Sequence, residues 1–208
     1  MRYRPGHKAE IHRKIVEDAS RRVRAEGLAG AAVSTVMRDA GLTHGGFYKH
    51  FGSKDDLLLE SLSEAFREIA DHLAHAAEKS KPGMAWKAIV KAYLSPEHCD
   101  HAEFGCPLAA LAPELARAHK AMKPRIAQEL VRYKSRVLPF MPGRHTVERE
   151  RAFFSIFTTM IGAIEIARLL PERAMREKVL VNARDFLLHS IGARPPRNRN
   201  SRAAPNRE

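Results

Sequence analysis

The sequence predicts an all-α fold, and three observations lead to this prediction. Apolar residues recur at helical spacing in most segments, as Ile11, Ile15, Ala19 and Val23 do near the N-terminus. Valine, isoleucine and threonine never alternate with polar residues over the length of a strand. Glycine and proline stand between the periodic segments, where they end helices. We therefore expect helices joined by turns, and no sheet.

The first expected helix covers residues 8–26 and ends at Gly27. Its apolar stripe faces the core, and the basic residues Arg13, Lys14, Arg21 and Arg24 are expected elsewhere on its surface. A second helix, 33–40, ends at Gly41, and Thr43 is the expected N-cap of a third, 44–51.

The fourth expected helix, 54–78, is long. Gly52 and Ser53 precede it, with Ser53 as its N-cap, and Asp55 and Asp56 fall in the first turn, where the helix dipole favours acidic side chains. Its buried stripe is Leu58, Leu62, Ala65, Phe66, Ile69 and Leu73. The remaining expected helices are 83–94, 107–118, 122–138, 145–169 and 172–190. Residues 95–105 are expected to form a loop, and 192–208 a disordered basic tail.

Charge is concentrated at the two ends of this 208-residue chain of net charge +12. Residues 1–54 carry 11 Lys and Arg against 5 Asp and Glu, whereas residues 55–191 carry 20 against 18. This distribution favours a polyanionic partner at the N-terminal end, against the simpler reading of a generally basic protein. No apolar run is long enough to span a membrane, and no apolar signal core is visible, so we expect a cytoplasmic protein. Two cysteines exclude a disulfide scaffold.

Residues 33–51, VSTVMRDAGLTHGGFYKHF, have the spacing of a helix-turn-helix. The apolar members are expected to pack the two helices together: Val36, Met37, Ala40, Leu42 and Phe47. The donor-bearing side chains of His44, Tyr48, Lys49 and His50 then remain on the outward face, where they suit phosphates and base edges.

Residues 11–66 resemble the DNA-binding region of the TetR family of bacterial transcriptional repressors. The resemblance is carried by IVEDASRRVRAEGL and VMRDAGLTHGGFYKHFGSKDDLLLESL. It implies about nine helices, three of them in a DNA-binding head (residues 1–53), with an effector-binding and dimerisation body (54–191). It also implies a homodimer that binds a palindromic operator in double-stranded DNA and is released by a small-molecule effector. A branch of the family further resembles this chain in a Gly-Cys pair that opens a helix of the body.

Carried over by position, the resemblance implies a recognition helix over 44–50. The implied DNA-binding residues are Ser34, Thr43, His44, Gly45, Gly46, Tyr48, Lys49, His50 and Lys54. This chain departs from the family at 29–32, Ala-Gly-Ala-Ala, where the usual cap of the second helix, with its phosphate contact, is either missing or shifted. The pair Gly45-Gly46 also weakens a short helix, by roughly 1 kcal/mol per glycine against alanine. It indicates either close backbone approach to DNA or a flexible helix start.

Cys106 stands at the expected start of a helix, ahead of Pro107. There the helix dipole lowers a thiol pKa, so Cys106 is either a sensor of oxidants and electrophiles or a small packing residue. Reading His98, Cys99, Asp100, His101 and Cys106 as a metal site matches no zinc spacing, and we expect no metal and no cofactor. The candidate effector residues beside Cys106 are Trp86, Tyr93, Leu111, Phe157 and Met160, although such a stripe also suits a plain core.

The segments 152–167 and 175–190 are the candidate dimer face. Small residues in the first would let a partner helix approach: Ser155, Thr158, Thr159, Gly162 and Ala163. No phosphate-binding loop, triad or metal motif indicates an enzyme. Two alternatives to a repressor remain open, namely a DNA-binding activator of the same fold and a helical protein-interaction adaptor. The tail arginines, Arg194, Arg197, Arg199, Arg202 and Arg207, form either a solvated end or a second DNA-binding arm.

Overall fold

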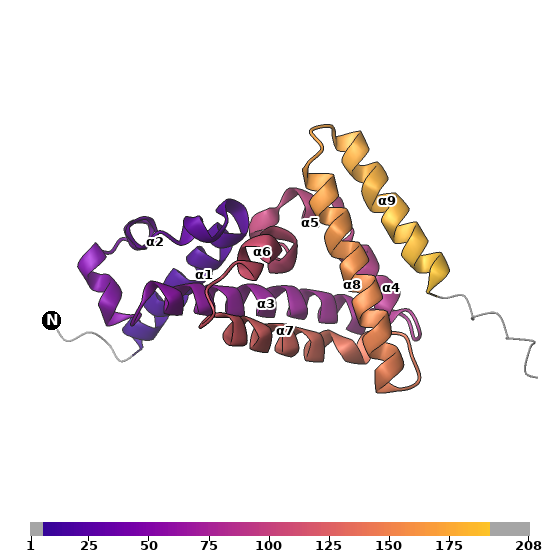
Figure 1. Ribbon diagram of the computed structural model, residues 1–208, viewed down its shortest axis with the longest axis horizontal. Coiled ribbons are helices and arrows are strands. Elements are labelled where there is room, and N and C mark those ends of the chain that lie inside the picture. The colour runs from indigo at the N-terminus through magenta and orange to yellow at the C-terminus, as the bar shows by residue number, and fades with distance from the viewer. Residues whose placement is uncertain (1–5, 192–208) are drawn as a thin grey trace, which may run out of the picture.

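The computed structural model describes residues 6–191, and in this range it contains nine α-helices, four short 3₁₀ helices and no β-strand (Figure 1). The predicted all-α fold is confirmed. The elements in order are α1 (His7–Glu26), η1 (Leu28–Ala31), α2 (Val33–Asp39), η2 (His44–Lys49), α3 (Lys54–Glu78), α4 (Ala85–Tyr93), α5 (Pro96–Asp100), η3 (Ala102–Phe104), α6 (Pro107–Ala116), α7 (Lys123–Val137), η4 (Leu138–Phe140), α8 (Thr146–Arg168) and α9 (Arg173–Ser190).

The helices are arranged along the long α3, which runs from one end of the molecule into its body (Figure 1). The helices α1 and α2 and the short η2 form a head at the N-terminal end. The helix α7 lies alongside α3, and α8 and α9 pack together at the opposite end. No helix in the described part of the chain is both long and apolar enough to cross a membrane.

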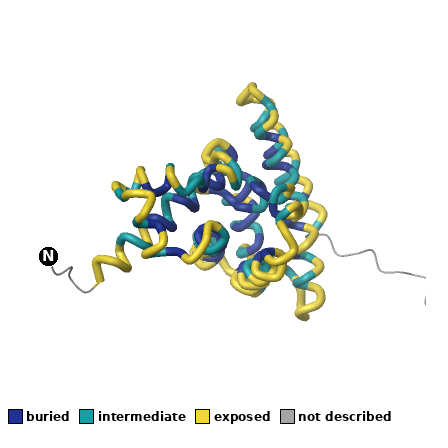
Figure 2. Tube along the Cα trace, turned by 60° about the vertical axis from the view of Figure 1, so that its left-hand side comes forward, coloured by how far each residue is buried: buried dark blue, intermediate teal, exposed yellow. Residues whose placement is uncertain are grey.

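Three clusters of buried apolar side chains hold these elements together. Figure 2 shows that the buried residues lie along the sides of the helices that face one another. The head cluster joins α1, α2 and η2 to Leu57 in the first turn of α3. A middle cluster joins Val23 of α1 to α3, α6 and α7. The largest cluster fills the body between α3, α4, α6, α7, α8 and α9. Because the first two clusters cross residue 54, head and body share buried contacts on both sides of the expected boundary.

Most expected elements are present, and Ser53 caps α3 by accepting a hydrogen bond from the Asp56 amide at 3.1 Å. Two expectations are wrong. Residues 95–105 form α5 and η3 instead of an open loop, because Ser95 caps α5 and a proline occupies its first turn. Arg24, expected on the surface, is buried. The tail 192–208 with its five arginines lies outside the described residues.

Candidate functional site

The turn between α2 and η2 is built by Gly41. Its φ of +72° is the left-handed conformation that glycine adopts without steric cost. The Gly41 amide donates to the carbonyl of Arg38, and the Leu42 amide donates to that of Met37, which is the hydrogen-bond pattern of a Schellman motif. Met37 and Phe47 are then buried in the head cluster, as predicted for a helix-turn-helix.

The expected recognition helix 44–50 is a 3₁₀ helix over His44–Lys49 rather than an α-helix. Its bonds run from residue i+3 to i, as from the Gly46 amide to the Thr43 carbonyl at 2.9 Å. The weak helix propensity of Gly45 and Gly46 accounts for this difference. Thr43 holds the N-cap position, but its side chain makes no capping hydrogen bond.

A basic groove of about 740 Å³ lies between η2 and the start of α1. It is lined by His7, Lys8, Ile11, Gly41, Leu42, Thr43, Gly46, Tyr48, Lys49 and His50. Tyr48 projects most strongly, with 71% of its surface exposed, and its ring meets Phe47 edge-on at 5.3 Å between centroids. The structure thus brings five of the nine predicted DNA-binding residues to one groove: Thr43, Gly46, Tyr48, Lys49 and His50.

The other four predicted residues do not line this groove. His44 and Gly45 are exposed on η2, while Ser34 and Lys54 are exposed in the first turns of α2 and α3. The departure noted at residues 29–32 is confirmed, since no side chain caps α2.

His50 faces the groove only in part. Its Nδ1 is buried without a hydrogen-bond partner, and its ring lies beside His12 and Phe51. Burial lowers the pKa of His50, and the neighbouring charges of His12, Lys8 and Lys49 lower it further. His50 is therefore neutral at pH 7, and Lys8 and Lys49 supply the positive charge of the groove.

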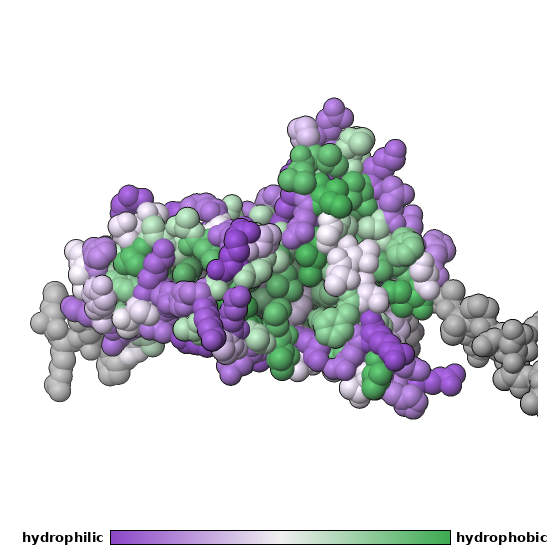
Figure 3. All heavy atoms as spheres, viewed as in Figure 1, coloured by the Kyte–Doolittle hydropathy of each residue, from purple (hydrophilic) through white to green (hydrophobic). Residues whose placement is uncertain are grey.

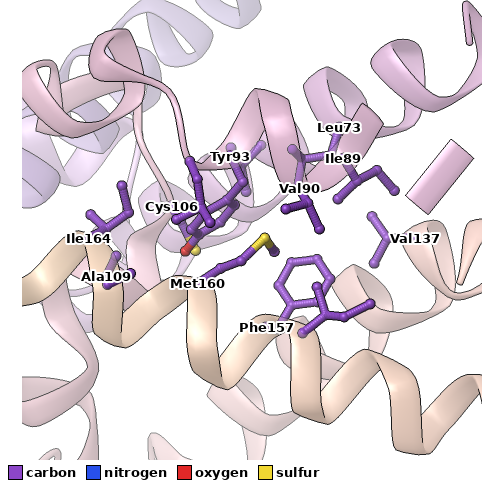
Figure 4. Close-up of a cluster of buried hydrophobic side chains, with 14 of the residues drawn as sticks. Leu73, Ile89, Val90, Tyr93, Cys106, Ala109, Val137, Phe157, Met160 and Ile164 are labelled. Atoms are coloured by element: carbon purple, nitrogen blue, oxygen red, sulfur yellow. The ribbon is translucent and has the colours of Figure 1, made fainter. Parts of the chain in front are cut away.

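Most of the predicted effector residues meet in the largest buried cluster. Figure 4 shows Tyr93 and Cys106 lying against each other, with Met160 and Phe157 of α8 beside them. Trp86 belongs to the same cluster. Leu111 does not, because it is buried in the middle cluster between the head and α7.

Cys106 occupies the N-cap position of α6 and is fully buried. Burial raises the pKa of its thiol, and this effect outweighs the hydrogen bonds at the helix start that lower it. The expectation of a lowered pKa is therefore wrong. The described residues hold no group of three or more His, Cys, Asp and Glu side chains placed to bind a metal.

His98 holds the turn that precedes α6. Its Nε2 lies 2.8 Å from the Cys106 amide and must accept that hydrogen bond, so Nδ1 carries the proton and donates to the Tyr93 carbonyl at 2.6 Å. Arg168 of α8 supports the same turn by donating to the carbonyls of His98 and Cys99 at 2.9 and 3.0 Å. The imidazole is thus neutral, with both nitrogens engaged.

We expect this neutral histidine to make the protein less stable as the pH falls. Burial lowers the pKa of His98 from 6.5 to about 4, so the unfolded chain takes up a proton at pH values where the native chain does not. The stabilisation is complete above the unfolded pKa and decreases as the pH falls towards the folded pKa, by about 3 kcal/mol in total. In His98→Gln the amide oxygen can still accept from the Cys106 amide but cannot titrate. Chemical denaturation of this variant should therefore show a smaller loss over that interval, and equal losses in the two proteins would contradict the assignment.

The head is tied to this turn by Arg24 of α1. The guanidinium donates to the Gly105 carbonyl at 3.2 Å, to the carbonyl and hydroxyl of Ser20, and to the carboxylate of Glu68 on α3. A second link joins the other end of α6 to the head, where Glu114 accepts from the Leu28 amide at 2.9 Å. The head is therefore joined by direct hydrogen bonds both to Gly105, the residue before Cys106, and to Glu114 of α6.

Sequence reasoning missed three residues of these sites. Lys8 lines the groove, and a basic N-terminal run was its only signal. Arg24 and Tyr133 gave no signal, because the residues that they meet, Gly105 and Cys106, lie in the turn before α6 and are distant in the sequence.

Fold and groove together define a helix-turn-helix protein with a helical body. Residues 15–61 match the family model described as bacterial regulatory proteins of the tetR family. The chain is therefore similar to this family over its N-terminal domain, within the same stretch that carries the residues quoted above.

Two curated transcriptional regulators are similar to this chain over part of its length. The HTH-type transcriptional regulator TtgR of Pseudomonas putida is 35% identical over 69 residues, covering 33% of this chain and 32% of TtgR. BetI of Stenotrophomonas maltophilia, also an HTH-type transcriptional regulator, is 30% identical over 125 residues, covering 57% and 64%. The matched part of this chain thus spans about a third of TtgR and just under two thirds of BetI.

Solved structures match almost the whole chain. A TetR-family transcriptional regulator from Cytophaga hutchinsonii superposes with a TM-score of 0.68 at 19% identity, covering 89% of this chain and 97% of that one. FadR from Bacillus subtilis, in complex with stearoyl-CoA, gives 0.63 at 16% identity, covering 86% and 98%. At these identities the comparison shows a shared fold.

Proposed function

We propose that this protein is a homodimeric transcriptional repressor, acting in the cytoplasm, that binds a palindromic operator in double-stranded DNA. The observation that carries the proposal is the basic groove of η2, with Tyr48 and Lys49 exposed at its edge. Lys49 and Lys8 bring positive charge to the phosphates, and Tyr48 reaches beyond the head surface. The head (1–53) reads DNA, and the body (54–191) binds the effector and the second copy.

Replacing Lys49 with alanine should weaken operator binding without unfolding the head, because this exposed side chain contributes charge rather than packing. Loss of one phosphate contact lowers the slope of log K against log salt by about one unit. DNA titrations at several salt concentrations measure this slope. Lys91→Ala, at an exposed lysine on α4, is the matched control and should leave the slope unchanged. An unchanged slope in Lys49→Ala would mean that Lys49 is a solvated charge away from DNA.

The dimer is proposed to form through α8 and α9. Large apolar side chains are exposed on both helices: Phe154 and Ile166 on α8, Leu169 at its C-cap, and Met175, Val181 and Phe186 on α9. Figure 3 shows apolar atoms gathered over the upper part of α8 and again towards α9. Isolated exposed apolar residues are common, but a face of this extent on two adjacent helices is typical of an interface. A second copy of the chain is the occupant that fits a palindrome.

The small residues of α8 suit close approach of a partner helix. Thr158 and Thr159 donate their hydroxyls to carbonyls of their own helix, at 2.7 and 2.8 Å, so neither needs a polar partner. A side-chain carbon added at Gly162 would meet nothing within 4 Å, which leaves space on this face. Ala163, expected on the same face, instead packs into the body cluster.

We further propose that the effector is a small molecule bound in the body. Ligand binding then displaces α6, and two hydrogen bonds transmit this displacement to the head: one from Arg24 to the Gly105 carbonyl, and one from the Leu28 amide to Glu114. The displacement changes the distance between the two heads of a dimer. An oxidant or electrophile acting on Cys106 is disfavoured, because the thiol is inaccessible and burial raises its pKa.

A further inference from the structure

Two buried tyrosine hydroxyls in the body have no hydrogen-bond partner. Tyr93 of α4 and Tyr133 of α7 are both almost fully buried, and neither phenol oxygen meets a partner within hydrogen-bonding geometry. Buried polar groups are paired in the great majority of cases, because leaving one unpaired costs its full desolvation free energy. Two such donors in one core therefore require an explanation beyond packing.

The thiol of Cys106 interacts with both hydroxyls, although neither phenol oxygen meets its sulfur in hydrogen-bonding geometry. Figure 4 shows Tyr93 and Cys106 next to each other. A thiol sulfur is only a weak acceptor, so it does not replace the oxygen that each phenol lacks. Burial raises the pKa of Tyr93 and of Tyr133 well above the usual value, so both remain neutral donors. These two O–H donors are therefore available to one acceptor that enters the core.

The walls around these donors are aromatic and deformable. Phe157 meets Tyr133 and Tyr93 edge-on, with ring centroids 5.4 and 6.0 Å away, and Phe66 lies 5.7 Å from Tyr133. Met160, an unbranched and polarisable side chain, adjoins the same cluster (Figure 4). A flat aromatic ring fits such surroundings through edge and offset contacts.

A crevice of about 250 Å³ lies between α3 and α7, on the side of the cluster formed by Tyr133 and Phe66. Tyr133 and Phe66 line it, and Arg67, Arg132 and Arg136 contribute to its lining. Each arginine is already paired with a carboxylate, so the entrance offers no free cation for an acidic ligand. A buried carboxylate would also cost more desolvation free energy than a neutral oxygen. The crevice has room for a ligand with one ring, and its paired lining charges favour a neutral ligand over an acidic one.

We propose that Tyr93, Tyr133 and Cys106 form the polar end of a binding site for a small, neutral aromatic molecule that carries a carbonyl oxygen. The two phenols donate to that oxygen, and the ring lies among Phe66, Phe157 and Met160. This inference names the ligand class of the effector proposed above and rests on that proposal for its regulatory meaning. The binding itself requires no DNA.

The test uses the full chain without DNA and two matched probes. Acetophenone carries a ring and a carbonyl oxygen, and ethylbenzene has the same ring and chain length without the oxygen. Binding is followed by the fluorescence of Trp86, the single tryptophan of the sequence, which lies in the same buried cluster. We expect saturable binding of acetophenone, with an affinity about tenfold or more above that of ethylbenzene, as expected for one or two added hydrogen bonds.

Two variants locate the donors. Tyr133→Phe and Tyr93→Phe should each lower acetophenone affinity about tenfold and leave ethylbenzene affinity unchanged. Both should also raise the melting temperature of the ligand-free protein, because each removes an unpaired buried hydroxyl. Ser61→Ala is the control for ligand affinity, since that buried hydroxyl already donates to the Leu57 carbonyl at 2.7 Å and lies in α3 away from the cluster.

Equal affinities for the two probes, or no saturable binding of acetophenone, would overturn the proposal. A lower melting temperature in both tyrosine variants would also overturn it, because the hydroxyls would then have partners in the core. These outcomes leave the DNA-binding function untouched. Conversely, acetophenone binding by a protein that selects no DNA sequence would reject the proposed function and retain this site.

Discussion

Replacing Ile166 with glutamate should convert the dimer into monomers and lower operator affinity by about 100-fold or more. Ile166 lies on the outer face of α8 and is 55% exposed in the single chain, so glutamate costs the folded monomer little. In the dimer this side chain would be buried against the second copy, where an unpaired carboxylate is strongly unfavourable. Because two linked heads bind a palindrome with an effective concentration that a monomer lacks, affinity falls without any change at the DNA face.

The control for this variant is Val131→Glu. Val131 is similar in shape, is 58% exposed, and lies on α7 rather than on the α8–α9 face. We expect sedimentation equilibrium to show a dimer for this control and a monomer for Ile166→Glu. If both variants remained dimers with unchanged DNA affinity, the partner surface would have to lie elsewhere.

Replacing Arg24 with methionine should lower the free energy of unfolding by about 4 kcal/mol. Arg24 is 2% exposed, and its guanidinium satisfies the Gly105 carbonyl, the Ser20 hydroxyl and the Glu68 carboxylate at once. Methionine fills a similar volume but leaves these acceptors without their donor, and Glu68 without its counter-charge. The loss therefore exceeds that from any one hydrogen bond.

Urea denaturation followed by helical circular dichroism measures this loss. Arg13→Met is the matched control, because Arg13 lies on the same helix and pairs only with Glu17 in a solvent-exposed ion pair. This control should stay within about 0.5 kcal/mol of the parent protein. A loss below about 1 kcal/mol in Arg24→Met would show that the bonds between α1, α3 and the start of α6 contribute little.

The helices could be predicted because the residues that begin and end them act on their immediate neighbours in the sequence. Gly27, Gly41 and Ser53 end or begin helices through conformational freedom or a capping hydrogen bond, and each acts on its immediate neighbours. The apolar stripe of α3 was predicted for the same reason, since helical spacing alone decides which side chains share a face. In η2, burial of Phe47 leaves the two residues that follow it, Tyr48 and Lys49, exposed.

The features that were not predictable depend on residues far away in the sequence. The sequence alone indicates a surface position for Arg24, because its hydrogen-bond acceptors Gly105 and Glu68 are 81 and 44 positions away. The raised pKa of the Cys106 thiol arises from complete burial, which a local reading of a helix start does not contain. Tyr133 became a candidate only when the fold placed it beside Cys106.

We propose that η2 reads a DNA sequence as part of a dimer. The most direct test exposes the purified full chain to a random duplex DNA library at physiological salt and sequences the retained molecules. We expect an enriched palindrome with two half-sites at fixed spacing, as two equivalent heads require. If the protein retained DNA without enriching any sequence, and if binding depended strongly on salt, this proposal would be contradicted. The groove around Tyr48 and Lys49 would then be no more than a basic surface.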